Sequence, residues 1–518
     1  MRLREAADRF GTPLYLYDLA EVTAARRQLC AALPSGSVLH YSLKANPHPA
    51  IVGVLAAAGL RAEVSSTGEL ATALAAGFEP AAVTYSGPAK TGAELAVAVR
   101  AGVRRFSVES LGDLRSLDAA AERAGRSVEF LLRVNADRPV PGMGLAMAGT
   151  GSKFGVDHSQ VAADPGAFRT ARAARFAGLH LYMGTNLPDE DVLTAQFETA
   201  LAVAADLGEA FGTGFAEVDL GGGFGAPYAR PGARQAFPGL RPRLEELLDR
   251  RLPGWRDGVP VISFESGRYL VASCGTLVTR VVDTKVSKGE RFAVLDSGVH
   301  HLGGMSGLRR LPAVAPVVIP VAGAADAAAG AATARDRDAD RDADPAVTQL
   351  VGPLCTPLDR WGAAPAGPDI AIGDLLAVPN VGAYGLSASL IAFLGHPAPV
   401  EVAVAEDGTA TASRLTVTRI PAPGTDDRSP GDEQERAVNL DPDLHRLLSR
   451  NLPLLAGREL TADTELSEFG LDSMRAVDLL FDIEDTFGVI LPDQVLAPGT
   501  FTTPRALWSA ILAAEVGR

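Results

Sequence analysis

The chain has 518 residues, of which 48 are lysine or arginine and 62 are aspartate or glutamate, giving a formal net charge of −14. This acidic balance argues against a nucleic-acid-binding surface, because such surfaces need clustered basic residues. Its three cysteines (Cys30, Cys274 and Cys355) are too scattered for a disulfide framework or a thiolate metal site. No apolar run reaches the roughly 18 residues that span a bilayer, and the charged N-terminus shows no export signal. We therefore expect a cytoplasmic protein without a metal and, at roughly 150 residues per domain, about three domains.

Before residue 300, short β-branched runs alternate with alanine-rich stretches of helical spacing. The first run is VLHYSLKAN at 38–46 and the last is VPVISFES at 259–266. Seven or eight such runs, separated by helices, predict parallel βα units that close into a TIM-like α/β barrel.

Lys44 ends the first of these strands and precedes a helix that begins near Pro49. This order places Lys44 at the C-terminal mouth of the barrel, where barrel enzymes keep their active sites. A lysine there is suited to forming a Schiff base if desolvation lowers its pKa, whereas the alternative is an ordinary exposed lysine. The chain contains only four other lysines, Lys90, Lys153, Lys285 and Lys288, so few candidates compete for this role.

Two further motifs follow later barrel strands. Gly221, Gly222 and Gly223 come after the strand AEVDL, where their backbone N–H groups could approach an anion, although a tight turn explains a glycine triplet equally well. Glu265 closes the last strand and is followed by Gly267 and Arg268. Glu265 could pair with a pyridine nitrogen, and Gly267 with Arg268 could bind a phosphate. Alternatively, Glu265 and Arg268 form a surface ion pair at a turn.

From about residue 271 to residue 417 the pattern changes to strands and turns, which predicts an antiparallel β domain. Cys355 lies beside a turn bounded by prolines, and Tyr384 lies between small residues in VGAYG. A buried inert cysteine and a core tyrosine are the alternatives to functional roles. The pair His300–His301 is either a substrate contact or a polar turn.

Two stretches lack the hydrophobic periodicity of folded elements. Residues 322–345 contain only alanine, glycine, threonine, aspartate, arginine and one proline, and are predicted to be a disordered insertion in the β domain. Residues 419–438 are predicted to be a linker, and within it residues 421–438 are rich in proline, glycine and acidic residues and reach about 60 Å when extended.

After this linker, residues 439–518 form a small, helix-rich unit with 13 acidic and 6 basic residues, so half of the net charge lies there. Ser473 stands at the start of an amphipathic helix, between Asp472 and Met474. In isolation Ser473 could be merely a helix N-cap.

The motifs YSLKAN, SSTGEL, LRVN, GLHLYMGT, DLGGGFG, ESGR, GPLCTPLD and GAYG, in this order, resemble those of the fold-type III pyridoxal-phosphate decarboxylases. This family contains diaminopimelate, ornithine and arginine decarboxylases, and the resemblance covers about residues 10–418. It implies a pyridoxal 5′-phosphate-binding barrel over 36–266, a β domain assembled from 1–35 and 267–418, and a homodimer with active sites at the subunit interface.

The resemblance also implies roles for individual residues. Lys44 would be the Schiff-base lysine, Glu265 would pair with the pyridine nitrogen, and Cys355 would reach across from the partner subunit to help reprotonate the substrate carbon. The other implied cofactor-binding residues are Arg133, Thr185, Gly221, Gly222, Gly223, Gly267, Arg268 and Tyr384.

Two positions depart from the family pattern. Tyr182 stands where the family has a histidine that stacks on the cofactor ring, and an aromatic side chain can still stack. Thr356 replaces an acidic residue that reads the distal amine of the substrate, so a basic diamino acid is disfavoured. The candidate substrate contacts are Thr356, Asp359, His300 and His301.

The C-terminal unit, with LTADTELSEFG ahead of the Ser473 helix, resembles an acyl or peptidyl carrier protein. The resemblance implies a small all-α four-helix domain whose Ser473 carries 4′-phosphopantetheine, added by a phosphopantetheinyl transferase. It also implies a ligase that loads the carrier, and downstream biosynthetic enzymes whose basic patches meet the acidic helix.

The fusion constrains the expected reaction. Decarboxylation at Cα needs a free α-amino group and a free α-carboxylate, and a thioester made through the α-carboxyl would lack the latter. We therefore expect a carrier-bound substrate linked through its side-chain carboxyl, such as a glutamyl or aspartyl thioester, in secondary-metabolite (antibiotic) biosynthesis. The alternatives are decarboxylation of a free amino acid, with the carrier serving a separate step, and a degenerate barrel that only supports the carrier.

Overall fold

The computed structural model describes residues 1–137, 151–187, 189–303, 317–319, 348–364 and 370–418. In the C-terminal region it describes residues 442–452, 454–455, 460–471, 473–487 and 501–516. The predicted insertion at 322–345 and the predicted linker at 419–438 lie outside the described residues. The chain divides into two compact units, Met1–Thr416 and Val417–Arg518, which are described separately.

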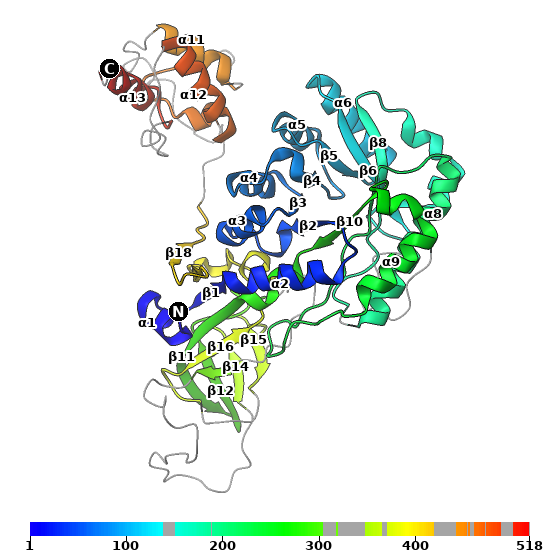
Figure 1. Cartoon of the computed structure of the whole chain (residues 1–518). Coiled ribbons are helices and arrows are strands. Elements are labelled where there is room, and N and C mark those ends of the chain that lie inside the picture. The colour runs from blue at the N-terminus through cyan, green and yellow to red at the C-terminus, as the bar shows by residue number, and fades with distance from the viewer. Residues whose placement is uncertain are drawn as a thin grey trace. The chain divides into compact units, whose positions relative to one another are not determined.

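Eight parallel strands of the first unit close into a barrel, which confirms the predicted α/β barrel (Figure 1). Pairing between β5 and β6 closes the ring, in the order β5-β4-β3-β2-β10-β9-β8-β6. The strands are β2 (Val38–Ser42), β3 (Arg61–Val64), β4 (Val83–Tyr85), β5 (Arg105–Val108), β6 (Val128–Asn135), β8 (Ala174–His180), β9 (Glu217–Asp219) and β10 (Val261–Ser266). The short β7 (Val156–Asp157) pairs with the end of β6.

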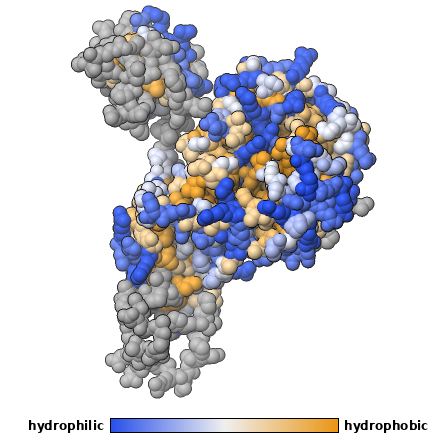
Figure 2. Space-filling model, in the orientation of Figure 1, coloured by the Kyte–Doolittle hydropathy of each residue, from blue (hydrophilic) through white to orange (hydrophobic). Residues whose placement is uncertain are grey.

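Helices surround this barrel, and several of them begin at polar caps (Figure 1). Ser66, Thr91, Ser110 and Asp189 each accept a backbone N–H bond in the first turn, which satisfies donors that a helix start leaves unpaired. The helices are α2 (Leu19–Ala32), α3 (Pro49–Ala57), α4 (Thr67–Ala75), α5 (Gly92–Arg100), α6 (Leu111–Arg123), α7 (His158–Ala163), α8 (Glu190–Phe211), α9 (Leu240–Arg251) and α10 (Arg268–Val271). Hydrophilic residues cover much of the outer surface that Figure 2 shows over the barrel.

The interior of the barrel contains charged side chains as well as apolar ones. Arg105 on β5 forms an ion pair with Glu217 on β9, although these strands are not neighbours, so the two side chains meet across the interior. Glu217 also accepts a 2.8 Å hydrogen bond from Ser263 on β10 and lies 4.0 Å from the buried His40. The polar residues of opposite strands are therefore paired with one another inside the ring.

A second sheet combines both ends of the first unit. β1 pairs with β11 on one side and with β17 on the other; the pair with β11 is antiparallel and the pair with β17 is parallel. β12 and β14 form a second parallel pair. The prediction of an antiparallel domain is wrong for these two pairs, because strands that no hairpin joins are free to run in either direction. The sheet and its flanking helix contain α1 (Leu3–Phe10), β1 (Leu14–Asp18), β11 (Gly275–Ser287), β12 (Glu290–Leu295), β13 (Val317–Ile319), β14 (Thr348–Val351), β15 (Arg360–Ala363), β16 (Leu375–Pro379), β17 (Val400–Val404) and β18 (Ala410–Arg414).

Helix α2, which connects β1 to the barrel, packs against α3 and α10 rather than on the sheet. The segment 1–35 thus supplies one strand to the β domain and one helix to the covering of the barrel.

The second unit contains α11 (Pro442–Asn451), α12 (Ser473–Phe487) and α13 (Pro504–Val516), consistent with a helical carrier domain. They enclose a small core that includes Leu448, Leu479 and Ile511. Ser473 is the first residue of α12. None of the helices in the described part of the chain combines the length and apolar character needed to cross a membrane.

Candidate active site

Lys44 lies at the C-terminal mouth of the barrel, as its position after the first strand predicts. It belongs to the short 3₁₀ turn Leu43–Ala45 that follows β2. Because Ser42 is paired with Glu63 on the neighbouring β3, the Glu63 carboxylate comes next to Lys44, with its two oxygens 3.2 and 3.1 Å from Nζ. The lysine side chain retains 43% of its exposed surface, so Nζ is accessible from the mouth.

The electrostatic surroundings of Lys44 differ from the sequence expectation. Desolvation alone would lower its pKa, but the carboxylates of Glu63 and Glu265 outweigh this effect and hold the pKa well above its ordinary value. In the free chain Lys44 is therefore an ammonium ion, which favours the approach of an anionic ligand.

Glu265 stands at the end of β10 with 3% of its side chain exposed. Its Oε1 lies 3.4 Å from Nε2 of His180, and Nδ1 of His180 lies 2.7 Å from the Ser107 hydroxyl. Burial would raise the pKa of Glu265, but His180, Lys44 and Arg133 together lower it below the usual range for a carboxyl. A carboxylate that stays ionised in a buried site is suited to pairing with a protonated ring nitrogen.

The three glycines after β9 form a closely packed turn. A Cβ on Gly222 would collide with the carbonyl oxygen of Glu265, and one on Gly221, whose φ is +65°, would lie 2.8 Å from the Leu181 oxygen. Gly221 donates to Asp219, whereas the N–H groups of Gly222 and Gly223 have no hydrogen-bond acceptor among the described residues. The turn can thus present free backbone donors to an anion.

Arg268 and Tyr384 come together beside the Lys44 turn. The guanidinium carbon of Arg268 is 4.8 Å from the centre of the Tyr384 ring, and the Tyr384 backbone N–H donates to Ala45 at 2.7 Å. Nε of Arg268 is buried without a hydrogen-bond partner. Gly267 permits this approach, because a Cβ there would lie 2.7 Å from the Ala45 methyl group. An unpartnered buried donor next to the ring of a tyrosine fits a phosphate-binding role.

Tyr182 and Arg133 border the same space. The Tyr182 ring centre is 6.0 Å from Lys44 Nζ and 5.7 Å from the Arg133 guanidinium carbon. Arg133 also forms a 3.0 Å ion pair with Glu109. Thr185 follows Tyr182 on the loop after β8. Tyr182 therefore lies where an aromatic ring could stack on a ligand bound at Lys44.

No hydrogen bond or ion pair among the described residues links the four candidate substrate contacts to the Lys44 group. The Asp359 carboxylate is 2% exposed and accepts 2.8 Å hydrogen bonds from the backbone N–H groups of Val299 and Leu354, so it braces two loops. Thr356 stands in the same turn-rich segment, between β14 and β15.

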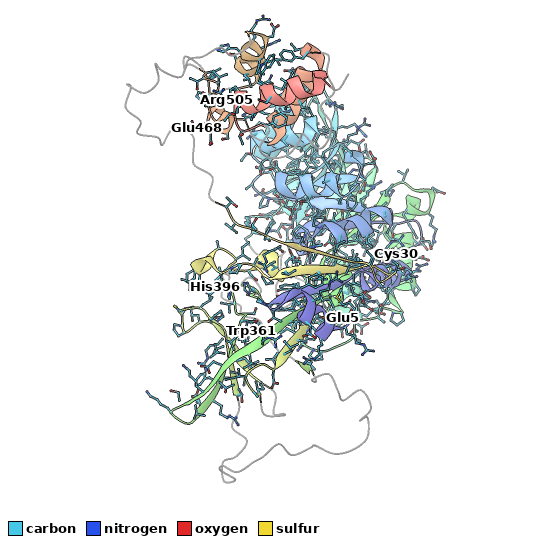
Figure 3. All side chains as sticks on the ribbon, turned by 90° about the vertical axis from the view of Figure 1, so that its left-hand side faces the viewer. Glu5, Cys30, Trp361, His396, Glu468 and Arg505 are labelled. Atoms are coloured by element: carbon cyan, nitrogen blue, oxygen red, sulfur yellow. The ribbon has the colours of Figure 1, made fainter. Side chains whose placement is uncertain are left out.

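His300 and His301 lie in a buried turn. Nδ1 of His301 lies 3.3 Å from the Ser297 hydroxyl and Nε2 lies 3.1 Å from the Pro397 carbonyl oxygen. Both nitrogens of His300 are buried without partners, and its ring lies 5.1 Å from that of His396, which Figure 3 labels. Burial lowers the pKa of His300 to about 4 and that of His301 to about 3, so both rings are neutral at pH 7.

Cys355 is exposed, and no hydrogen bond or ion pair among the described residues links it to the Lys44 group. A role for this thiol in its own chain's site has no support in the geometry. An exposed position is compatible with the expected role across a subunit interface.

The sequence analysis missed Glu63, Glu109 and His180. Glu63 and His180 are both buried. Glu63 is the last residue but one of β3, and His180 is the last residue of β8. The criterion that selected Lys44, a polar residue at the carboxyl end of a barrel strand, would have found both.

The Gly222→Ala variant tests the turn after β9. The added methyl group has to displace the Glu265 backbone, so we expect a loss of about 1–3 kcal/mol in the free energy of unfolding. Chemical denaturation measures this loss. The control is Gly214→Ala, whose Cβ would meet no atom within 4 Å, and an equal loss in both variants would contradict the packing argument.

Comparisons with known proteins find matches for both units of the chain. The family model for the pyridoxal-dependent decarboxylase, pyridoxal binding domain, matches residues 19–272, and that for the phosphopantetheine attachment site matches residues 442–511. The L-glutamyl-[BtrI acyl-carrier protein] decarboxylase of Niallia circulans is 34% identical over 399 residues, covering 76% of this chain and 89% of the relative. The diaminopimelate decarboxylase of Zymomonas mobilis is 28% identical over 416 residues, covering 79% of this chain and 91% of the relative.

Among solved structures, AQ1208 from Aquifex aeolicus has a TM-score of 0.63 at 27% identity, covering 80% of this chain and 90% of that one. The diaminopimelate decarboxylase from M. jannaschii in complex with L-lysine has a TM-score of 0.66 at 23% identity, covering 79% of this chain and 91% of its own.

Proposed function

Because the chain belongs to the pyridoxal-dependent decarboxylase family, we propose that it decarboxylates an amino acid that its own carrier domain holds through the side-chain carboxyl group. Pyridoxal 5′-phosphate and 4′-phosphopantetheine are its two cofactors. The observation that carries the proposal is the presence of a phosphopantetheine attachment site on the same chain as a decarboxylase barrel.

The residues at the barrel mouth fit pyridoxal phosphate in chemistry. Lys44 would bind its aldehyde carbon, Glu265 would face the ring nitrogen, and Tyr182 would stack on the ring. The free N–H groups of Gly222 and Gly223, the unpartnered Nε of Arg268, and Tyr384 would hold the phosphate, with Gly221, Gly267, Thr185 and Arg133 around them. When bound, the cofactor supplies an electron sink for the carbon that loses carbon dioxide.

The chain's own groups have defined tasks around that chemistry. Glu265 keeps its negative charge because His180 and Lys44 stabilise it, so it can keep a ring nitrogen protonated. Glu63 holds Lys44 Nζ at 3.1 Å and fixes the position of the amine at the mouth. Asp359 positions the loop that carries Cys355 by bonding to the backbone N–H of Leu354.

The carrier constrains which carboxyl group the substrate uses for attachment. α-Decarboxylation consumes the α-carboxylate, so the thioester has to use another carboxyl group of the amino acid. The Niallia circulans relative is named for a glutamyl group on an acyl-carrier protein, which supports a side-chain thioester here. Thr356 has no carboxylate, so this position does not favour a substrate whose distal group is a cation.

The proposed assembly is a homodimer in which Cys355 of one chain serves the site of the other and donates a proton to the substrate carbon. The Cys355 thiol is exposed, and Leu358, three residues further along the same turn, has 70% of its surface exposed. An exposed apolar side chain beside this turn in the sequence supports an interface there. In each chain of this proposed dimer, residues 36–266 form the barrel and residues 439–518 form the carrier domain. Further partners are a phosphopantetheinyl transferase, a ligase that loads the carrier, and downstream enzymes.

Intact-protein mass spectrometry tests the tethered reaction. Ser473 is loaded enzymatically with glutamyl or aspartyl phosphopantetheine linked through the side-chain carboxyl, and pyridoxal phosphate is then added. We expect the carrier-bound species to lose the mass of one carbon dioxide, and the α-linked glutamyl isomer, as control, to keep its mass. No loss from any side-chain-linked species, together with turnover of a free amino acid, would favour the free-substrate alternative.

A further inference from the structure

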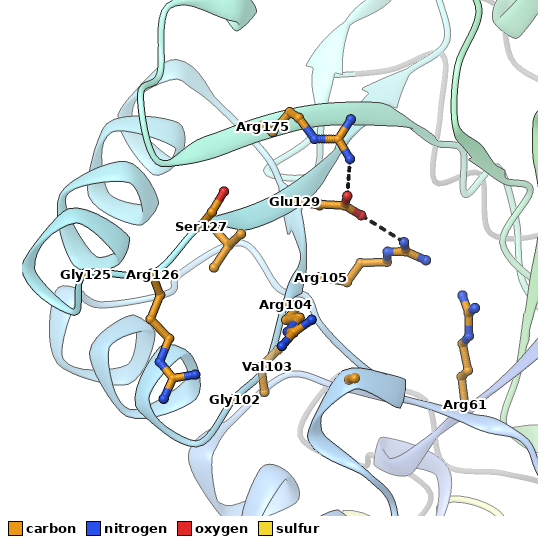
Figure 4. A pocket seen from close by; sticks show the side chains of 12 residues that line it. Arg61, Gly102, Val103, Arg104, Arg105, Gly125, Arg126, Ser127, Glu129 and Arg175 are labelled. Carbon is orange, nitrogen blue, oxygen red and sulfur yellow. Dashed lines mark hydrogen bonds and ion pairs between the residues drawn. The ribbon is translucent and has the colours of Figure 1, made fainter.

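A cavity of about 580 Å³ opens at the N-terminal end of the barrel, at the opposite end from the mouth that holds Lys44 (Figure 4). Its wall forms where barrel strands begin, because Arg61 is the first residue of β3, Arg105 the first of β5, and Arg175 the second of β8. These strands are parallel, so their first residues gather at one end of the ring. The cavity is therefore separate from the decarboxylase site.

Positive charge dominates the lining of this cavity. Five arginines, Arg61, Arg104, Arg105, Arg126 and Arg175, stand against one acidic residue, Glu129. In Figure 4 the Glu129 carboxylate lies between the guanidinium groups of Arg105 and Arg175, and it pairs with both.

Behind the wall, Glu217 pairs with Arg105 and lies 3.6 Å from Arg61. The two carboxylates leave three positive charges in excess, on a chain whose net charge is −14. Arg104 and Arg126 are exposed, and neither forms an ion pair with any carboxylate in the described ranges.

Several donors of this wall are not satisfied by the protein. The buried Nε of Arg105 has no hydrogen-bond partner, whereas Nη1 of Arg61 has the Glu217 carboxylate at 3.6 Å. A buried donor without an acceptor is costly, so a nearby anion would be favourable. The unpaired guanidinium groups of Arg104 and Arg126, together with Nε of Arg105, point to a ligand that carries several acceptor oxygens.

We propose that this arginine-lined cavity binds an organic phosphate of about nucleotide size. Guanidinium groups pair bidentately with phosphate oxygens, and the volume lies within the range of roughly 300–1,000 Å³ that small-molecule sites occupy. Ala81, Val103 and Val128 give the wall an apolar portion for the organic part of such a ligand. The lining contains neither a lysine nor a histidine.

Isothermal titration calorimetry with the full-length enzyme, loaded with pyridoxal phosphate, tests this proposal. The probes are magnesium-free ATP, pyrophosphate and citrate, at constant ionic strength because salt screens exposed charges. We expect ATP to bind more tightly than pyrophosphate, and citrate to bind least. The Arg104→Ala/Arg126→Ala double variant should lose at least about tenfold in affinity for ATP, since each removed guanidinium takes away charge-assisted bonds.

The matched control is Arg251→Ala, which removes an exposed arginine at the end of α9, away from the cavity lining. The Arg104→Ala/Arg126→Ala double variant and the Arg251→Ala control should both keep the decarboxylase activity and the unfolding temperature of the wild type. If the double variant folds poorly, Arg104→Gln/Arg126→Gln replaces it, with the same expected loss. An affinity for ATP that is equal in the double variant and the wild type would overturn the proposal, as would no binding at millimolar ATP. Citrate binding as tight as that of ATP would overturn the preference for phosphate.

Discussion

Lys44→Ala is expected to lose decarboxylase activity by at least about 10³-fold and to lose covalent retention of pyridoxal phosphate. The variant removes the primary amine at the barrel mouth, and neither Lys90 nor Lys285 stands beside it. Lys90 is held by Asp113 at 2.7 Å, and Lys285 lies on β11 of the β domain. Activity is measured as carbon dioxide release, and covalent attachment by borohydride reduction followed by peptide mass spectrometry.

The same experiment assigns the attachment residue directly. The wild-type enzyme should carry the reduced cofactor on the peptide that contains Lys44, and Lys44→Ala should carry none. Lys285→Ala removes an exposed lysine and is the control that should behave as wild type. A cofactor adduct on any lysine other than Lys44 would contradict the site described above.

Ser473→Ala is expected to abolish every reaction of carrier-bound substrate while leaving the barrel intact. The phosphopantetheine arm attaches through the serine hydroxyl, so the variant cannot be loaded, and intact mass spectrometry should find no added mass after treatment with a phosphopantetheinyl transferase. The unfolding of the barrel and its binding of pyridoxal phosphate should not change, because Ser473 belongs to the other compact unit.

Ser467→Ala is the matched control, since Ser467 is an exposed serine in the turn Leu466–Phe469 that precedes α12. It should accept the arm and support turnover as the wild type does. Uptake of the arm by Ser473→Ala would show that another residue carries it. Equal turnover of a free amino acid by both variants and the wild type, without turnover of loaded carrier, would contradict the proposed function.

The sequence predicts the barrel well because its signal is local. Most of the strands are short apolar runs, and several helices begin at a recognisable polar cap such as Ser66 or Ser110. The pairing of β1 with β17 joins residues about 385 positions apart, for example Tyr15 with Glu401, and no local pattern specifies its direction. Hydrophobic periodicity therefore cannot predict that this sheet contains parallel as well as antiparallel pairs.

The site was predictable to the extent that its residues stand at strand ends. Lys44 and Glu265 were found by that criterion, and the structure brings both into one electrostatic group. His180, two residues before Tyr182, also ends a barrel strand, β8, and therefore meets the same criterion. The bracing role of Asp359 could not have been predicted, since it depends on the backbone N–H of Val299, 60 residues away.

The charge pairs that cross the barrel interior bear on how the chain folds. Arg105 is made long before its partner Glu217, and Ser263, which bonds to the same carboxylate, is made later still. Removal of one member of a buried ion pair leaves an uncompensated charge, which typically costs about 3–5 kcal/mol. Arg105 still meets Glu129 on β6 in a partial barrel that ends before β9, whereas Glu217, with 3% of its side chain exposed, needs Arg105 of β5 when β9 joins the ring. The ring should therefore unfold as one cooperative unit rather than strand by strand.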